Sequence, residues 1–130
     1  MAEFATRQLP VAPDVLAPDG SRVRLLLSLA GGSMAHFELP AGEVARAVRH
    51  RTVEEIWFVV AGNGELWRSC DGRSETVSLS VGTSVTIPLG TAFQFRASAG
   101  GPLGILGVTM PPWPGEGEAI PADGRWRPTV

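Results

Sequence analysis

The sequence carries one close pair of ionisable side chains able to share a proton or bind a metal. His50 precedes Glu55 by five positions, and the apolar run IWFVVAG follows directly. A carboxylate raises the proton affinity of a neighbouring imidazole and fixes its tautomer, which suits general acid–base chemistry. Both groups also bind divalent transition metals. Either chemistry requires a fold that turns the two side chains toward one interior.

The other reactive residue types are weaker candidates. His36 lies between Met34 and Glu38 in an alternating segment, and we expect it to be a surface or half-buried hydrogen-bonding residue. Cys70 is the single cysteine; it can form no internal disulfide and has no neighbouring base in sequence, so we interpret it as an unreactive thiol. We expect Arg96 to form a local ion pair.

Composition narrows the class of protein. A chain of 130 residues with 16 glycines and 11 prolines suits one domain built of short elements and tight turns. The formal charge is −2, lysine is absent and the 11 arginines are scattered, which argues against a nucleic-acid partner. The apolar runs are too short to cross a membrane, and the N-terminus does not resemble a signal peptide. A cytoplasmic location is therefore expected.

Hydrophobic alternation with a period of two predicts β-strands and no helix. Hairpin turns are expected at 30–33 and 71–73, and Gly62-Asn63-Gly64 supplies residues that accept the positive φ angles of tight hairpins. Eight or more short strands with regular turns predict an all-β barrel or jelly roll. The segments read as strands are 23–29, 35–39, 47–51, 55–60, 65–70, 76–80, two short ones around Pro88 and Gly90, and 103–110.

This pattern divides the chain into three parts. We expect an N-terminal arm over residues 1–20, a β-barrel over 21–110 and a Pro-rich C-terminal tail over 111–130. Proline has no amide donor for a central ladder, so the tail is expected to pack on the barrel or on a partner subunit.

The element order and two spaced motifs resemble the cupin superfamily, specifically the small single-domain cupins of the cupin 2 conserved-barrel type. The resemblance implies a double-stranded β-helix, or jelly-roll, barrel around a central pocket, and its motifs span residues 42–97. The family anchors that match are His50, Glu55 and Gly62 in the first motif and Gly82, Pro88 and Gly90 in the second.

The departures from the family pattern fall on the metal ligands. Val48 and Phe93 stand where the family has histidines, and Ala97 stands where it has asparagine. Two remaining ligands provide roughly half of the ~10–16 kcal/mol of a four-ligand zinc site, a dissociation constant on the order of 1–100 μM. We therefore expect no tightly held cofactor, and a weakly bound divalent transition metal only if a third ligand such as His36 joins His50 and Glu55.

The residues that share the parity of Glu55 predict an apolar interior. Trp57 and Val59 follow it on one strand, and Phe93 and Phe95 face them from the second-motif strand, beside Val48. Aromatic walls suit a small organic ligand better than a hydrated ion. The alternative is a barrel packed solid by these same rings.

Three function classes are compatible with this site. The first is a non-catalytic small-molecule binder. The second is a metal-free or weakly metal-dependent isomerase or cyclase with His50 and Glu55 as acid and base, as in cupins that resemble sugar-nucleotide epimerases. The third, a metal-dependent cupin oxygenase or isomerase, ranks last because its ligands are missing. The outward-facing Ile56, Phe58 and Val60 favour a homodimer.

Overall fold

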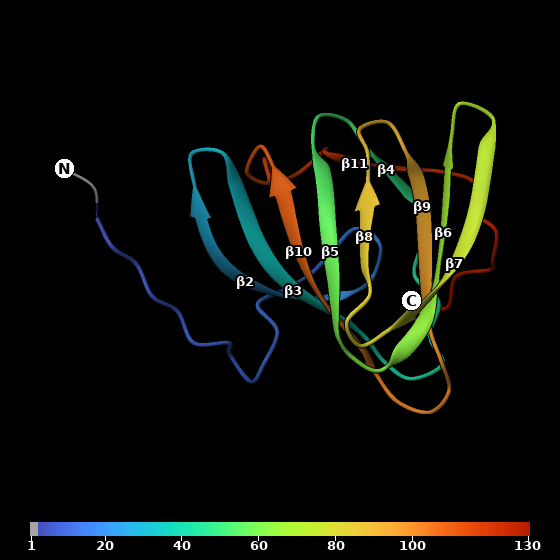
Figure 1. Ribbon diagram of the computed structural model, residues 1–130, viewed down its shortest axis with the longest axis horizontal. Helices are drawn as coiled ribbons and strands as arrows, with labels where there is room; N and C mark the ends of the chain where they lie inside the picture. The colour runs from blue at the N-terminus through green and yellow to red at the C-terminus, as the bar shows by residue number, and fades with distance from the viewer. Residues whose placement is uncertain (1–2) are drawn as a thin grey trace.

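A computed structural model describes residues 3–130, which form eleven β-strands and no helix (Figure 1). The predicted all-β class is confirmed. Since the described part of the chain has no helix, it has none long and apolar enough to cross a membrane. The strands are β1 (Val15–Leu16), β2 (Arg22–Leu29), β3 (Gly32–Leu39), β4 (Val48–His50), β5 (Glu54–Ala61), β6 (Asn63–Cys70), β7 (Arg73–Ser80), β8 (Ser84–Ile87), β9 (Ala92–Ala97), β10 (Leu103–Met110) and β11 (Ala119–Pro121).

The strands form two facing antiparallel sheets, the double-stranded β-helix that was predicted. Sheet A has the order β1-β2-β3-β10-β5-β8, and sheet B has the order β11-β4-β9-β6-β7. The chain crosses from sheet B to sheet A between β4 and β5. Consequently His50, at the end of β4, and Glu55, near the start of β5, approach each other from opposite walls of the barrel.

The hairpin turns predicted at 30–33 and 71–73 are confirmed, whereas the hairpin predicted at 62–64 is wrong, because β5 and β6 lie in different sheets and do not pair. Asp71 and Gly72 both have positive φ, 52° and 75°, and they connect the paired ends of β6 and β7. Two successive residues with positive φ give the twist that a two-residue hairpin needs. Gly62 has a φ of 77°, and a side chain there would collide with the carbonyl oxygen of Pro102. Glycine is therefore required at position 62 both by the backbone conformation and by the lack of space for a side chain.

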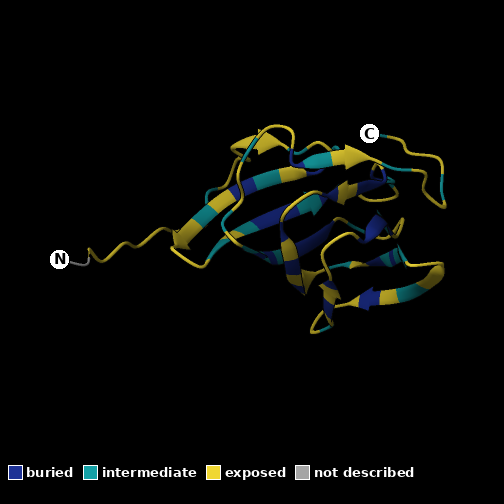
Figure 2. Ribbon diagram, turned by 90° about the horizontal axis from the view of Figure 1, so that it is seen from above, coloured by how far each residue is buried: buried dark blue, intermediate teal, exposed yellow. Residues whose placement is uncertain are grey.

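Aromatic side chains fill the centre of the barrel between the two sheets. Trp57 from β5 packs edge-on against Phe37, Phe93 and Phe95, with ring centroids 4.9–5.5 Å apart. Figure 2 shows the buried residues alternating along the strands that enclose this centre. The same alternation leaves every second residue of the central strands on an outer face.

The two terminal segments differ in how they meet the barrel. Residues 3–9 are exposed and project away from it (Figures 1 and 2), whereas Val15 and Leu16 already pair with β2. The tail returns along sheet B, where β11 pairs with β4 as an edge strand ending at Pro121. An edge position tolerates that proline because its missing amide faces no partner strand.

Candidate functional site

The centre of the site is a buried contact between an imidazole and a carboxylate. His50 Nδ1 lies 2.8 Å from Glu55 Oε2, and both side chains are more than nine-tenths buried. The angle of this contact falls outside hydrogen-bonding geometry, so it is a close polar contact without a directed hydrogen bond. Trp57 Nε1 donates to the other oxygen, Glu55 Oε1, at 3.2 Å. The structure thus brings together the two residues predicted to act as a pair.

Aromatic rings enclose the imidazole on two sides. The Phe93 ring lies 5.2 Å from the His50 ring and the Trp113 ring lies 5.0 Å from it, both edge-on. Trp113 belongs to the tail and remains 36% exposed. Its backbone N–H donates to Ser33 Oγ at 2.9 Å, and that hydroxyl also hydrogen-bonds Thr109 Oγ1. Trp113 therefore covers His50 at one end of the barrel.

A second buried carboxylate fixes the tail beside this pair. Glu118 Oε1 accepts hydrogen bonds from the backbone N–H groups of Thr52 and Val53, at 2.6 and 2.9 Å, and the Thr52 hydroxyl also donates to the carboxylate. Burial alone would raise the pKa of Glu118, but these donors and nearby His50 outweigh it and lower that pKa. The β4–β5 connection and the tail are thus joined by a charged group.

A third carboxyl group lies within electrostatic range of the pair. Asp19 precedes β2 and is half-buried as a residue, although its carboxyl group is enclosed. Desolvation is the main cause that raises its pKa, and the negative charge of Glu55 adds to it. The Ser21 N–H and hydroxyl, which donate to Asp19 Oδ1, and the charge of His50 oppose that rise without cancelling it.

Comparison with known proteins identifies the family. A family model described as the cupin domain matches residues 35–109, more than half of the chain. The chain is a cupin. This match spans both predicted motifs up to β10. No curated protein matches this cupin in sequence.

Solved structures show the same fold at low identity. BH2720 from Bacillus halodurans is 19% identical over 75% of each chain, with a TM-score of 0.65. KdgF from Halomonas sp. is 18% identical, covers 75% of this cupin and 85% of its own chain, and has a TM-score of 0.63. Oxalate decarboxylase from Bacillus subtilis is 14% identical over 82% of this cupin and 28% of its own chain, with a TM-score of 0.69. At these identities the likeness establishes the fold alone.

The residues of the site do not fit a conventional metal centre. Within residues 3–130, no group of three or more His, Cys, Asp and Glu side chains comes close enough to hold a metal ion. Val48 and Phe93, which replace two family histidines, are paired neighbours on β4 and β9. His36, the third ligand considered, lies on the outer face of sheet A but is only 8% exposed, so it is more buried than expected; its Nδ1 lies 3.4 Å from Arg24 Nη1. It does not join His50 and Glu55.

The residues predicted to line a pocket are packed against one another. Trp57, Val59, Phe93, Phe95 and Val48 all belong to the buried core. Their role as ligand-binding walls stays a prediction.

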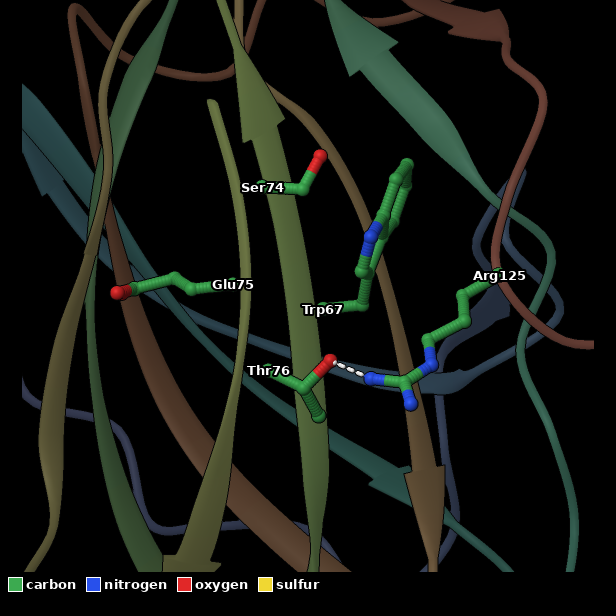
Figure 3. Close-up of a pocket in the computed structure, with 5 residues that line it drawn as sticks. All are labelled: Trp67, Ser74, Glu75, Thr76 and Arg125. Atoms are coloured by element: carbon green, nitrogen blue, oxygen red, sulfur yellow. Dashed lines mark hydrogen bonds between the residues drawn. The ribbon is translucent and has the colours of Figure 1, made fainter. Parts of the chain in front are cut away.

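Two open surface depressions of this cupin lie away from the pair. One, of about 360 Å³, lies on the outer face of sheet B, where Trp67, Thr76 and Arg125 gather and Arg125 donates to the Thr76 hydroxyl, while Glu75 is directed elsewhere (Figure 3). The other, of about 410 Å³, includes Thr91 and the β6–β7 turn. Neither contains His50 or Glu55.

Sequence reasoning missed three participants in the site: Asp19, Trp113 and Glu118. Each is brought to the pair by the path of a terminal segment, which strand periodicity does not encode. One signal was available for the tail. Trp113 is a large aromatic residue in a Pro-rich segment that was expected to pack on the barrel.

Proposed function

We propose that this cupin binds a small organic molecule at the end of the barrel where Trp113 covers His50. The observation that carries the proposal is the position of one buried ionisable ring between two aromatic rings, Phe93 and Trp113. A planar ligand there gains ring contacts and a polar partner at the same time. Because the middle of the barrel is filled, the ligand lies at its mouth.

Trp113 is the movable wall of this proposed site. Its indole belongs to a tail segment that contains Gly115 and Gly117, both with positive φ, and it is partly exposed. A flat ligand that takes the place of the indole takes over its edge-on contact with the His50 ring. The indole therefore competes with the ligand for one surface.

The experiment uses benzoate, phenol and benzamide as probes, because each consists of one aromatic ring with a different polar group. We expect at least one of them to shift the NMR signals of the His50 ring and the Trp113 indole N–H. Trp113→Ala is expected to bind that probe more tightly because the competitor is gone. Trp126→Ala, which alters the other tail tryptophan, is the matched control and leaves the affinity unchanged. Probes that shift neither signal at millimolar concentration contradict the proposal.

A second candidate function, metal-free acid–base catalysis, is favoured by the 2.8 Å contact between His50 and Glu55. Trp57 holds the carboxylate, and the carboxylate faces Nδ1. This arrangement is expected to keep the proton on Nδ1 and leave Nε2 as the basic nitrogen. Nitrogen-15 shifts of the ring at neutral pH report the tautomer. A tautomer that is the same in wild type and Glu55→Gln removes this candidate.

A metal-dependent activity has the least support, because two donors do not complete a site. Any divalent metal held by His50 and Glu55 is expected to be weakly bound. Elemental analysis of protein purified without chelator tests this, and a near-stoichiometric transition metal overturns the ranking. The cytoplasmic location expected from the sequence stays a proposal that fractionation of the source cell tests.

A further inference from the structure

The open depression on the outer face of sheet B is lined by an aromatic side chain. Leu66 belongs to the core, so Trp67, the next residue on β6, faces outward and is half-buried. The register places Trp67 between Gln94 on β9 and Thr76 on β7. The depression has a volume of about 360 Å³, and Arg125 from the tail forms another part of its lining (Figure 3). An aromatic wall in a concave surface suits the flat part of a small molecule.

Arg125 is positioned beside Trp67 by a close attachment of the tail to sheet B. The next residue, Trp126, donates its backbone N–H to Oε1 of Gln94 at 2.8 Å, and its carbonyl oxygen accepts from Nε2 of the same amide at 2.8 Å. Gln94 is fully buried, and a side chain at Gly124 would collide with its amide. The backbone on both sides of Arg125 therefore lies close against the sheet, which directs its side chain over the depression.

Arg125 supplies the depression with a positive charge. Its guanidinium donates to the hydroxyl of Thr76 and lies over the Trp126 ring, with Cζ 5.7 Å from the ring centroid. In the part of the chain that the structure describes, no carboxylate forms an ion pair with this guanidinium. Glu75, which also lines the depression, points the other way and pairs with Arg68 at 2.5 Å (Figure 3). The depression thus combines an available cation with an aromatic wall.

We propose that this depression binds a small anion that carries a planar ring, of the class of the aromatic carboxylates. The ring lies against the accessible part of the Trp67 indole, and the carboxylate accepts hydrogen bonds from the guanidinium of Arg125. Because Thr76 accepts an N–H from Arg125, its own hydroxyl proton is free to donate to the same carboxylate. A guanidinium presents paired donors that match the two oxygens of a carboxylate. The site lies outside the barrel, so this inference does not rest on the function proposed above.

The affinity of this site is expected to depend on both parts of the ligand. Arg125 is exposed, so water and salt screen its attraction for the carboxylate. Removal of the charge from either partner should therefore weaken binding about fivefold, which equals about 1 kcal/mol. Added salt should weaken the binding of the anion and leave the binding of a neutral molecule with the same ring unchanged.

NMR titration with naphthoate and with naphthamide tests the proposal. The two probes share one ring system, and only naphthoate carries a negative charge. The indole N–H signals of the tryptophans report where each probe binds, and Trp67→Phe identifies the signal of Trp67 by its loss. We expect naphthoate to shift the Trp67 signal with a dissociation constant about fivefold lower than that of naphthamide.

Arg125→Gln separates the charge from the rest of the site. This variant is expected to bind naphthoate about fivefold more weakly than wild type and to bind naphthamide as wild type does. Arg127→Gln is the matched control, because Arg127 is an exposed arginine of the same tail outside the lining of the depression; it should bind naphthoate as wild type does. A Trp67 signal that does not move, equal affinities for the two probes, or wild-type affinity in Arg125→Gln overturns the proposal. A shift confined to Trp113 also overturns it, since that result places the anion at the His50 end of the barrel.

Discussion

The carboxylate of Glu118 is predicted to stabilise the packing of the tail and the position of Trp113 over His50. Glu118→Gln removes the charge but keeps one acceptor oxygen for Thr52 and Val53, whereas Glu118→Ala removes the acceptor entirely. A hydrogen bond to a charged group contributes about 1.5–3 kcal/mol, and unpaired buried donors add a penalty. We expect a loss of about 1–2 kcal/mol for Gln and about 2–4 kcal/mol for Ala.

These losses are measurable by thermal unfolding. For a domain of this size, each kcal/mol lowers the midpoint by roughly 4 °C, so we expect about 4–8 °C for Gln and about 8–16 °C for Ala. Glu116→Gln is the matched control, since Glu116 is exposed two residues away on the same tail and should leave the midpoint unchanged. In both Glu118 variants the Trp113 indole should also become more accessible to acrylamide quenching.

The pH dependence gives an independent check. The folded-state pKa of Glu118 lies below its ordinary value of 4.5, so its contribution is present above that value and is lost as the pH falls through the folded-state pKa. The difference between wild type and Glu118→Gln should therefore shrink in acid. An equal midpoint for wild type and Glu118→Ala at neutral pH would refute this account of the tail.

Three further predictions follow from other buried polar groups. Asp19→Asn should stabilise the fold at neutral pH, because the pKa of Asp19 is raised in the folded state and its ionised carboxylate therefore destabilises that state. The advantage of the variant disappears below about pH 3.8, where the carboxyl group is protonated in both the folded and the unfolded state. Urea unfolding at pH 7 and pH 3 tests this prediction. Gln94→Leu should cost about 2–4 kcal/mol, since the amide donates to the carbonyls of Ala45 and Trp126 and accepts from Trp126 N–H; faster tryptic cleavage at Arg125, with Ser78→Ala as control, reports the loosened tail. Trp57→Phe should cost about 2–3 kcal/mol in urea unfolding and shift the His50 ring signals, because it removes the donor to Glu55.

Alternation and turn chemistry were enough to predict most strands, because each sheet has one face on the core. Val23 to Leu29 and Leu103 to Met110 became β2 and β10. Periodicity does not show which sheet a strand joins. That β4 and β5 lie in different sheets, and so hold His50 and Glu55 on opposite walls, required the structure.

The surroundings of the pair were harder to predict than the pair itself. The family motif spacing identified His50 and Glu55 directly. Trp113 and Glu118 reach them only because the tail folds back over the barrel, and no local pattern fixes that path. By strand parity Gln94 faces away from Phe93 and Phe95, yet Gln94 is fully buried because the tail covers it from outside.

Because His50 and Glu55 are attached to separate sheets, the distance between their side chains depends on the width of the barrel. If the two walls move apart, the Glu55 carboxylate moves away from the imidazole, and the NMR signals of the ring are expected to change. The NMR signal of the His50 ring is therefore expected to report changes in the width of the barrel, including those caused by a ligand bound at its end.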